Sequence, residues 1–208
     1  MLIVVYGGSG SGKSAYAEDL IIKENQLRYQ GRLPMYYFAT MQVIGEEGEE
    51  RVRKHRKLRE GKGFVTIEQE RDVAEIIQDE SSVCFQYEKM DDGNKIVTAN
   101  PYAILLECMS NLVANEMFRE NEVIAPDVVE EKIKQDLKLL MESCEILVVV
   151  TNNVFEDGIQ YDTDTMNYLN VLAEVNAFLT CRAYEVIEVV AGIPVWIKPF
   201  LKNEWDAG

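Results

Sequence analysis

A glycine-rich turn near the N-terminus carries the residue types that bind a nucleotide. Residues 7–14 read GGSGSGKS, in which Gly7, Gly12, Lys13 and Ser14 satisfy the pattern G-x-x-x-x-G-K-[ST]. In this motif backbone N–H groups close around phosphates, the lysine reaches the β- and γ-phosphate oxygens, and the serine hydroxyl ligates Mg²⁺. We therefore expect a nucleotide-binding loop, with Ser14 also a Mg²⁺ ligand. Its residues are Gly7, Gly8, Ser9, Gly10, Ser11, Gly12, Lys13 and Ser14.

The segments on either side of this turn fit the strand and helix that the motif needs. The apolar residues 2–6 predict a strand, and Ala17, Leu20 and Ile21 share one face of a helix over 15–24. The N-terminus of that helix then points at the phosphates, where backbone N–H groups and the helix dipole favour negative charge. A chance glycine-rich turn rarely has both flanking elements, so the sequence predicts a phosphate-binding loop.

The chain is strongly acidic, with a formal net charge of −15 over 208 residues. This charge repels a nucleic-acid duplex or an anionic membrane surface. No apolar run approaches the length of a membrane span, and no basic leader precedes the first strand. Cys84, Cys108, Cys144 and Cys181 lack C-x-x-C spacing and a nearby histidine, as is typical of buried thiols in a reducing compartment. We expect a cytoplasmic protein with no nucleic-acid partner and no membrane span.

Apolar runs and helical patterns alternate along the chain. Strands are expected at 2–6, 35–40, 64–68, 102–107 and 145–151, with two short ones around Gly192 and Pro194. Helices are expected at 15–24, 46–60, 71–79 and 109–119, from an N-cap at Asp127, and at 165–182 with Met166, Leu169, Leu172 and Leu179 buried. This alternation predicts an α/β fold, P-loop NTPase-like, with a mostly parallel central sheet, helices on both faces and a C-terminal edge hairpin.

Length and composition favour one domain. A chain of 208 residues with 47% hydrophobic content can bury one α/β core, so we expect a single nucleotide-binding domain over 1–208. Residues 83–100 place an Asp-Gly pair between β-rich runs, which predicts an excursion outside the central sheet.

Polar residues follow several of the expected strands, at the edge where open parallel sheets bind ligands. Glu107 follows the run AILL, where an acid can hold Mg²⁺ or the attacking hydroxyl. We expect Glu107 to be catalytic and to contribute to the Mg²⁺ site. Thr40 occupies the same position after residues 35–39, and residues 151–153 follow LVVV. Asparagine is also common in turns for conformational reasons, so the second of these indications is weaker.

The basic segment RVRKHRKLR contains the only histidine of the chain, His55. A lone histidine on a solvated helix is most often a polar surface residue. Here its neighbours Arg51, Arg56 and Arg59 concentrate positive charge in an acidic protein, which attracts a polyphosphate. A neutral imidazole in that field could attack an α-phosphorus. From the residues alone, both interpretations stay open.

In order and spacing these segments resemble the bifunctional adenosylcobinamide kinase/adenosylcobinamide-phosphate guanylyltransferase family of cobalamin biosynthesis. The resemblance spans nearly the whole chain and rests on GGSGSGKS, YFAT, ERVRKHRKLR, FVTIE, AILLEC, VVVTNNV, Asn176 and VVAGIPVWIK. It implies a P-loop fold, ATP and GTP as substrates, and phosphorylation of the cobinamide aminopropanol hydroxyl. It further implies GMP transfer through a guanylylated histidine matching His55, nucleotide contacts from Thr40, Arg51, Arg56 and Arg59, corrinoid substrates, and a homo-oligomer.

The chain departs from the family pattern at positions outside the P-loop. Asn153 and Phe155 stand where the family has glutamate and glycine, Leu169 replaces an arginine, and Ala177 replaces a glutamine. Two other classes therefore stay open. One is a P-loop kinase of different specificity without guanylyl transfer, and the other is a non-catalytic nucleotide-dependent switch. The intact Lys13, Ser14 and Glu107 argue against the switch.

Overall fold

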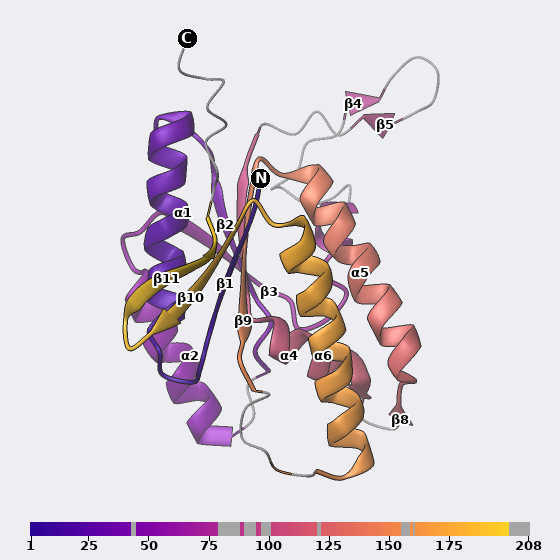
Figure 1. Cartoon of the computed structure of the whole chain (residues 1–208). Coiled ribbons are helices and arrows are strands. Elements are labelled where there is room, and N and C mark those ends of the chain that lie inside the picture. The colour runs from indigo at the N-terminus through magenta and orange to yellow at the C-terminus, as the bar shows by residue number, and fades with distance from the viewer. Residues whose placement is uncertain are drawn as a thin grey trace.

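The central sheet has seven strands in the order β11-β10-β1-β9-β6-β2-β3 (Figure 1). The computed structural model describes residues 1–42, 45–78, 88–89, 95–96, 101–119, 122–154, 159 and 161–199. The strands are β1 (Leu2–Gly7), β2 (Met35–Ala39), β3 (Phe64–Glu68), β6 (Ala103–Glu107), β9 (Ile146–Asn152), β10 (Glu185–Val190) and β11 (Ile193–Lys198). All neighbouring strands pair in parallel except β10 and β11, which are antiparallel. The expected mostly parallel sheet with a C-terminal edge hairpin is confirmed.

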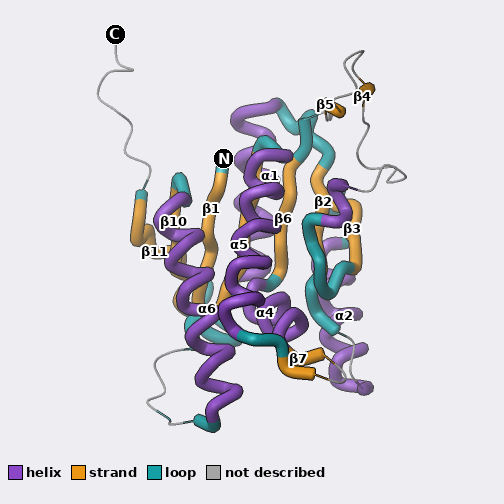
Figure 2. Tube along the Cα trace, turned by 90° about the vertical axis from the view of Figure 1, so that its right-hand side faces the viewer, coloured by secondary structure: helices purple, strands orange, loops and turns teal. Residues whose placement is uncertain are grey.

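Helices cover both faces of this sheet. They are α1 (Lys13–Tyr29), α2 (Gly45–Arg59), α3 (Glu75–Gln78), α4 (Met109–Met117), α5 (Pro126–Ser143) and α6 (Thr163–Arg182). Figure 2 shows α4, α5 and α6 in front of the strands, and Figure 1 shows α1 on the other side. The central strands β1, β6 and β9 are buried on both faces, which explains why they are continuous apolar runs rather than alternating ones.

Two apolar clusters form the core, one on each face. On the α1 side, Ala17, Leu20 and Ile21 pack against alternate strand residues such as Val5 and Val148, as the helical periodicity predicts. The cluster on the other side takes residues from α4, α5 and α6 together with the remaining alternate positions of the strands. Both faces of the sheet are therefore occupied by helices at its centre.

The structure corrects several local predictions. Cys181, expected to be buried, is exposed. The helix expected at 71–79 begins only at Glu75, and the one expected at 109–119 ends at Met117. Asp127 does not cap α5, because the helix begins at Pro126 with Ala125 as its N-cap residue, and proline is tolerated in a first turn. Met166 is not buried but 38% exposed. The first turns of α6 extend past the end of the sheet (Figure 1), so the buried face begins at Val171 and continues through Leu172, Val175 and Leu179.

Outside the central sheet lie two short antiparallel pairs. One joins β4 (Glu88–Lys89) to β5 (Lys95–Ile96), and the other joins β7 (Phe118–Arg119) to β8 (Glu122–Val123). The first falls within the expected excursion at 83–100 and forms no part of the central sheet, and the rest of that segment is outside the described residues. Among the helices that the structure describes, none is long and apolar enough to cross a membrane.

Candidate active site

The turn between β1 and α1 is a tight loop in which Gly7, Gly10 and Gly12 occupy positions that disfavour any other residue. A Cβ atom on Gly7 would lie 2.5 Å from the carbonyl oxygen of Val189, and Gly10 and Gly12 have φ values of 71° and 88°. The turn between β10 and β11 lies behind the loop, where the N–H of Gly192 donates to the carbonyl oxygen of Ser11 at 2.8 Å. The first turn of α1 begins directly after the loop, at Lys13. Its free N–H groups therefore face the space where a phosphate would bind.

The two motif side chains both point to groups in this region. Lys13 Nζ donates to the carbonyl oxygen of Gly8 at 3.2 Å, so the lysine folds back over the loop. The Ser14 hydroxyl donates to Oε1 of Glu107, which lies 93 residues further along the chain. The predicted phosphate loop and the predicted strand-end carboxylate are thus in direct contact.

Glu107 is held at the end of β6 by a second hydroxyl. The Tyr37 OH donates to Oε2 of Glu107 at 2.7 Å, while Ser14 donates to the other oxygen. Burial and the Glu107 carboxylate raise the pKa of Tyr37 well above its usual range, so the phenol stays a donor at neutral pH. Both carboxylate oxygens of Glu107 therefore accept from neutral hydroxyl groups.

Thr40, at the end of β2, is fully buried. Its hydroxyl donates to the carbonyl oxygen of Cys108 at 2.9 Å and accepts from the Cys108 N–H at 2.8 Å. Asn115 of α4 donates to the Thr40 carbonyl oxygen at 2.7 Å. These contacts fix the ends of β2 and β6 relative to each other beneath the Glu107 carboxylate. Contact of Thr40 with nucleotide stays a prediction.

Since β9 lies between β1 and β6, its last residues are placed between the P-loop and Glu107. The Asn153 N–H donates to the carbonyl oxygen of Gly7 at 3.2 Å, and Asn152 Nδ2 donates to Ser110 Oγ at 2.6 Å. The Thr151 hydroxyl donates to Oδ1 of Asn176, which places Asn176 on the inner side of α6 as expected.

Two of the predicted basic residues, Arg56 and Arg59, lie near the end of α2 in different surroundings. Arg59 is only 7% exposed, and its Cζ atom lies 3.6 Å from the centre of the Tyr37 ring. Arg56 is exposed and forms an ion pair with Glu68 at the end of β3. His55 and Arg51 lie in α2, but their side chains are outside the described residues. Of the predicted basic residues whose side chains the structure describes, Arg59 is thus placed against Tyr37, a partner of Glu107, and Arg56 is not.

Sequence reasoning assigned no role to Tyr37, Glu18 or Lys62. Glu18 is 1% exposed and accepts from Lys62 Nζ at 2.9 Å, and burial raises the pKa of Glu18. Tyr37 carried one usable signal, a hydroxyl-bearing side chain within an apolar strand that ends at Thr40. The Glu18–Lys62 pair carried none, since it joins α1 to the loop after α2.

A cavity of about 500 Å³ opens beside this region, between α6 and strands β1, β9, β10 and β11. Its walls include Asn153 and Ala177, which depart from the family pattern, and also Thr151 and Asn176. Two of the departures, Asn153 and Ala177, therefore line a neighbouring cavity and leave the P-loop unchanged.

A P-loop at the first turn of a mostly parallel sheet, with a carboxylate from a strand two positions away, defines an α/β nucleotide-binding protein of the P-loop NTPase-like class. A family model described as cobinamide kinase / cobinamide phosphate guanyltransferase matches residues 3–197. The chain belongs to this family, CobU. Members of the family use nucleotides as substrates.

Two curated relatives cover almost all of the chain. The bifunctional adenosylcobalamin biosynthesis protein CobU of Escherichia coli K12 is 29% identical over 207 residues, 95% of this chain and 100% of the relative. The protein of the same name from Salmonella typhimurium LT2 is 30% identical over the same lengths. The resemblance read from the motifs is confirmed, and at this identity the chain is a divergent member.

Proposed function

We propose that this protein phosphorylates adenosylcobinamide and then transfers GMP from GTP to adenosylcobinamide phosphate. The observation that carries the proposal is the contact between Ser14 of the P-loop and Glu107, in a chain that belongs to the cobinamide kinase / guanyltransferase family along residues 3–197. The hydroxyl contact from Ser14 supports a role for the Glu107 carboxylate beside the phosphates of a P-loop-bound nucleotide.

In the kinase step the loop N–H groups and Lys13 bind the phosphates of ATP or GTP. Among the described residues, no group of three or more His, Cys, Asp or Glu side chains could hold a metal ion. A Mg²⁺ site made of one hydroxyl, one carboxylate and the phosphates of the substrate fits Ser14 and Glu107. When bound, Mg²⁺ neutralises charge on the transferring phosphoryl group. Glu107 also orients the acceptor hydroxyl for in-line attack, and Lys13 stabilises the charge that develops.

In the second step the imidazole of His55 attacks the α-phosphorus of GTP, forming an N–P bond as pyrophosphate leaves. The phosphate of adenosylcobinamide phosphate then attacks the same phosphorus, forming a P–O–P link and releasing the imidazole. Splitting the transfer in this way requires a nucleophilic nitrogen that is neutral near pH 7, and His55 is the only histidine of the chain. The cationic side chains of Arg51 and Arg56 offset the charge of the triphosphate.

Both steps are tested by one experiment on the purified protein. With ATP and adenosylcobinamide we expect phosphorylation of the corrinoid, and with GTP and Mg²⁺ we expect a GMP-sized mass increase on the intact protein. Lys13→Ala should lower the kinase rate by about 10³-fold without unfolding the protein, because its one side-chain contact is to a loop carbonyl. His55→Asn should lose the mass increase and keep the kinase rate.

The outcomes separate the alternatives. Kinase activity without a covalent GMP adduct identifies a P-loop kinase that lacks the transferase step. Nucleotide binding without either reaction identifies a nucleotide-dependent switch. A cytoplasmic location, a homo-oligomeric state and a single domain over 1–208 stay predictions.

A further inference from the structure

The guanidinium group of Arg59 is buried without hydrogen-bond partners for two of its nitrogens. Among the described residues, neither Nε nor Nη1 of Arg59 has a partner, although the side chain is 7% exposed. A buried unpaired cation is unfavourable, and stacking on an aromatic ring only partly offsets that cost. The stack on Tyr37 at 3.6 Å is the aromatic contact that the structure gives this guanidinium group.

Tyr37 contacts functional groups through both its ring and its hydroxyl. Arg59 stacks on its ring, which also packs edge-on against Phe64 with the two ring centres 6.2 Å apart. Its OH donates to Glu107. The side chain is 3% exposed, so it has little freedom to turn. Since Ser14 donates to the other oxygen of Glu107, one continuous set of contacts runs from the last residue of α2 to the P-loop.

The turn that follows α2 is tied to α1 as well. The Lys62 N–H donates to the Arg59 carbonyl oxygen at 3.0 Å. Lys62 Nζ contacts Glu18 and Asp19 of α1, both at 2.9 Å. The position of Arg59 is thus set by the way the end of α2 packs on α1, and that position is passed to Glu107 through Tyr37.

We propose that Tyr37 is a positioning residue that holds Glu107 for phosphoryl transfer. We further propose that Arg59, through its contact with Tyr37, makes phosphoryl transfer depend on how the end of α2 packs against α1. The proposal rests on the proposed kinase function. His55 lies four residues before Arg59 in α2, so the helix that carries the guanylylated residue also supports the kinase carboxylate. The two reactions are coupled through one helix.

The first test is a double-mutant cycle between Tyr37 and Glu107. Tyr37→Phe keeps the ring beneath Arg59 and removes only the hydroxyl, so we expect kcat for corrinoid phosphorylation to fall about tenfold, a larger change than the accompanying rise in KM for ATP. In a Glu107→Gln background the same substitution should cost nothing further, because Tyr37 acts through Glu107. Additive losses would overturn the proposal, since they would mean that Tyr37 acts independently of the carboxylate.

The second test is a cycle between Arg59 and Tyr37. Arg59→Met fills similar space without charge and should lower kcat about fivefold in the wild-type background. It should have no effect in the Tyr37→Phe background, where the contact to Glu107 is already lost. Arg182→Met is the matched control, because Arg182 stacks on Phe178 at 3.9 Å on α6 and should leave kcat unchanged. Equal effects of Arg59→Met in both backgrounds would contradict the coupling.

Failure of the proposed function is distinguishable from failure of this inference. If the wild-type protein does not phosphorylate adenosylcobinamide, the proposed function is wrong. The double-mutant cycle between Tyr37 and Glu107 is then carried out with the dissociation constant of ATP in place of kcat. Tyr37→Phe should weaken ATP binding in Mg²⁺ but not in EDTA, and only when Glu107 is present. An unchanged affinity in Mg²⁺ would overturn the positioning role. Far-ultraviolet circular dichroism of every variant shows whether the fold is kept.

Discussion

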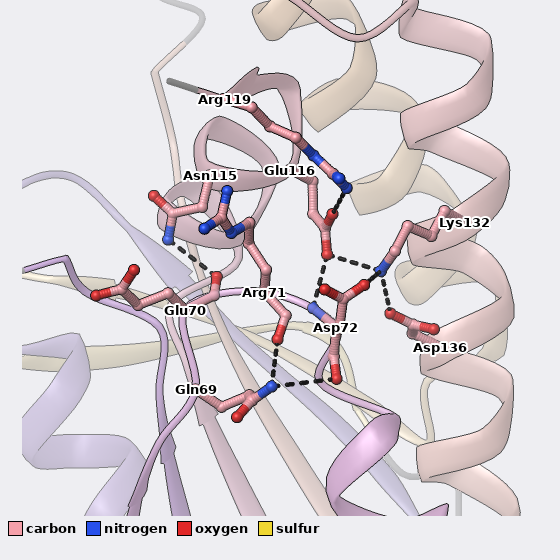
Figure 3. A network of polar contacts seen from close by, with 9 residues as sticks. All are labelled: Gln69, Glu70, Arg71, Asp72, Asn115, Glu116, Arg119, Lys132 and Asp136. Atoms are coloured by element: carbon pink, nitrogen blue, oxygen red, sulfur yellow. Dashed lines mark hydrogen bonds and ion pairs between the residues drawn. The ribbon is translucent and has the colours of Figure 1, made fainter. Parts of the chain in front are cut away.

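Two regions of this protein are each built around a glutamate, one fully buried and one half-buried, and the two glutamates have opposite kinds of partner. Glu116 of α4 has a fully buried side chain that binds Lys132 at 2.7 Å, Arg119 at 3.2 Å and the N–H of Asp72 at 2.8 Å (Figure 3). Glu107 accepts from two neutral hydroxyls, and no lysine or arginine forms an ion pair with it in the part of the chain that the structure describes. The charge of Glu116 is neutralised within the protein, whereas the described residues supply no ion pair for Glu107, as the proposed Mg²⁺ site requires.

The Glu116 network supports the site without taking part in it. Lys132 also contacts Asp72 and Asp136, both at 2.9 Å. Burial alone would lower the pKa of Lys132, but hydrogen bonds to Glu116, Asp136 and Asp72 outweigh it and raise the pKa. Together these contacts tie the loop after β3 to α4 and α5. Figure 3 shows how close this loop lies to Asn115, which donates to the Glu70 carbonyl oxygen and also binds Thr40.

The largest effect is expected at Glu107. Glu107→Gln should lower the kinase kcat by about 10²-fold, because the amide keeps the shape but loses the charge that would hold Mg²⁺ and the acceptor hydroxyl. The free energy of unfolding should change by no more than about 1 kcal/mol, since its partners are neutral donors. Steady-state kinetics and urea unfolding measure the two quantities. Equal losses of ATP affinity and rate would mark Glu107 as a structural carboxylate and remove the contrast with Glu116.

The opposite result is expected at Glu116. Glu116→Ala should lower the free energy of unfolding by about 1–3 kcal/mol, because Arg119 and the Asp72 N–H lose their partner while Lys132 keeps Asp72 and Asp136. The kinase rate per folded molecule should stay within a few-fold of wild type. Glu130→Ala is the control, since Glu130 pairs with Lys134 on the helix surface and should cost no more than about 0.5 kcal/mol. A stability loss at Glu116 no larger than at Glu130 would contradict the assignment.

The smallest effect concerns Glu18, which is as buried as Glu116 but pairs with the single cation Lys62. Burial raises its pKa above the ordinary value of 4.5, so the folded protein binds this proton more tightly than the unfolded chain does. The contribution of Glu18 to stability is therefore fully present below the unfolded pKa and is lost as pH rises through the folded pKa. Urea unfolding of wild type and Glu18→Gln at a series of pH values tests this.

The expected result is that wild type loses stability relative to Glu18→Gln as pH rises from about 4 toward neutrality. Stability curves that stay parallel across this range would show that the Glu18 carboxylate is compensated as fully as that of Glu116.

Sequence alone predicted those parts of the site that depend on local chain geometry. The loop at residues 7–14 and the strand-end position of Glu107 follow from a motif and from the rule that parallel strands bind ligands at their carboxyl ends. The contact between Tyr37 and Arg59 could not be predicted in the same way, because it depends on where α2 packs after leaving the sheet. Glu116 was missed for a similar reason, since two of its partners, Asp72 and Lys132, lie 44 residues before it and 16 residues after it.

The errors in the fold have equally specific causes. Asp127 is a favourable N-cap residue in isolation. Proline is also favourable in the first turn of a helix, and α5 begins at Pro126, one residue earlier. The periodicity of α6 identifies which residues share a face, and it carries no information on where that face runs past the end of the sheet. Met166 lies in the part of α6 that precedes its buried residues, so the core does not cover its side chain and it is exposed.

The hairpin behind the P-loop has a consequence for how the loop keeps its shape. β1 pairs with β9 and β10, and the carbonyl oxygen of Ser11 in the loop accepts from the N–H of Gly192. The backbone that supports the phosphate-binding loop therefore comes from segments far along the chain. A substitution that displaces the turn at Gly192 should weaken nucleotide binding although every residue of the motif is intact.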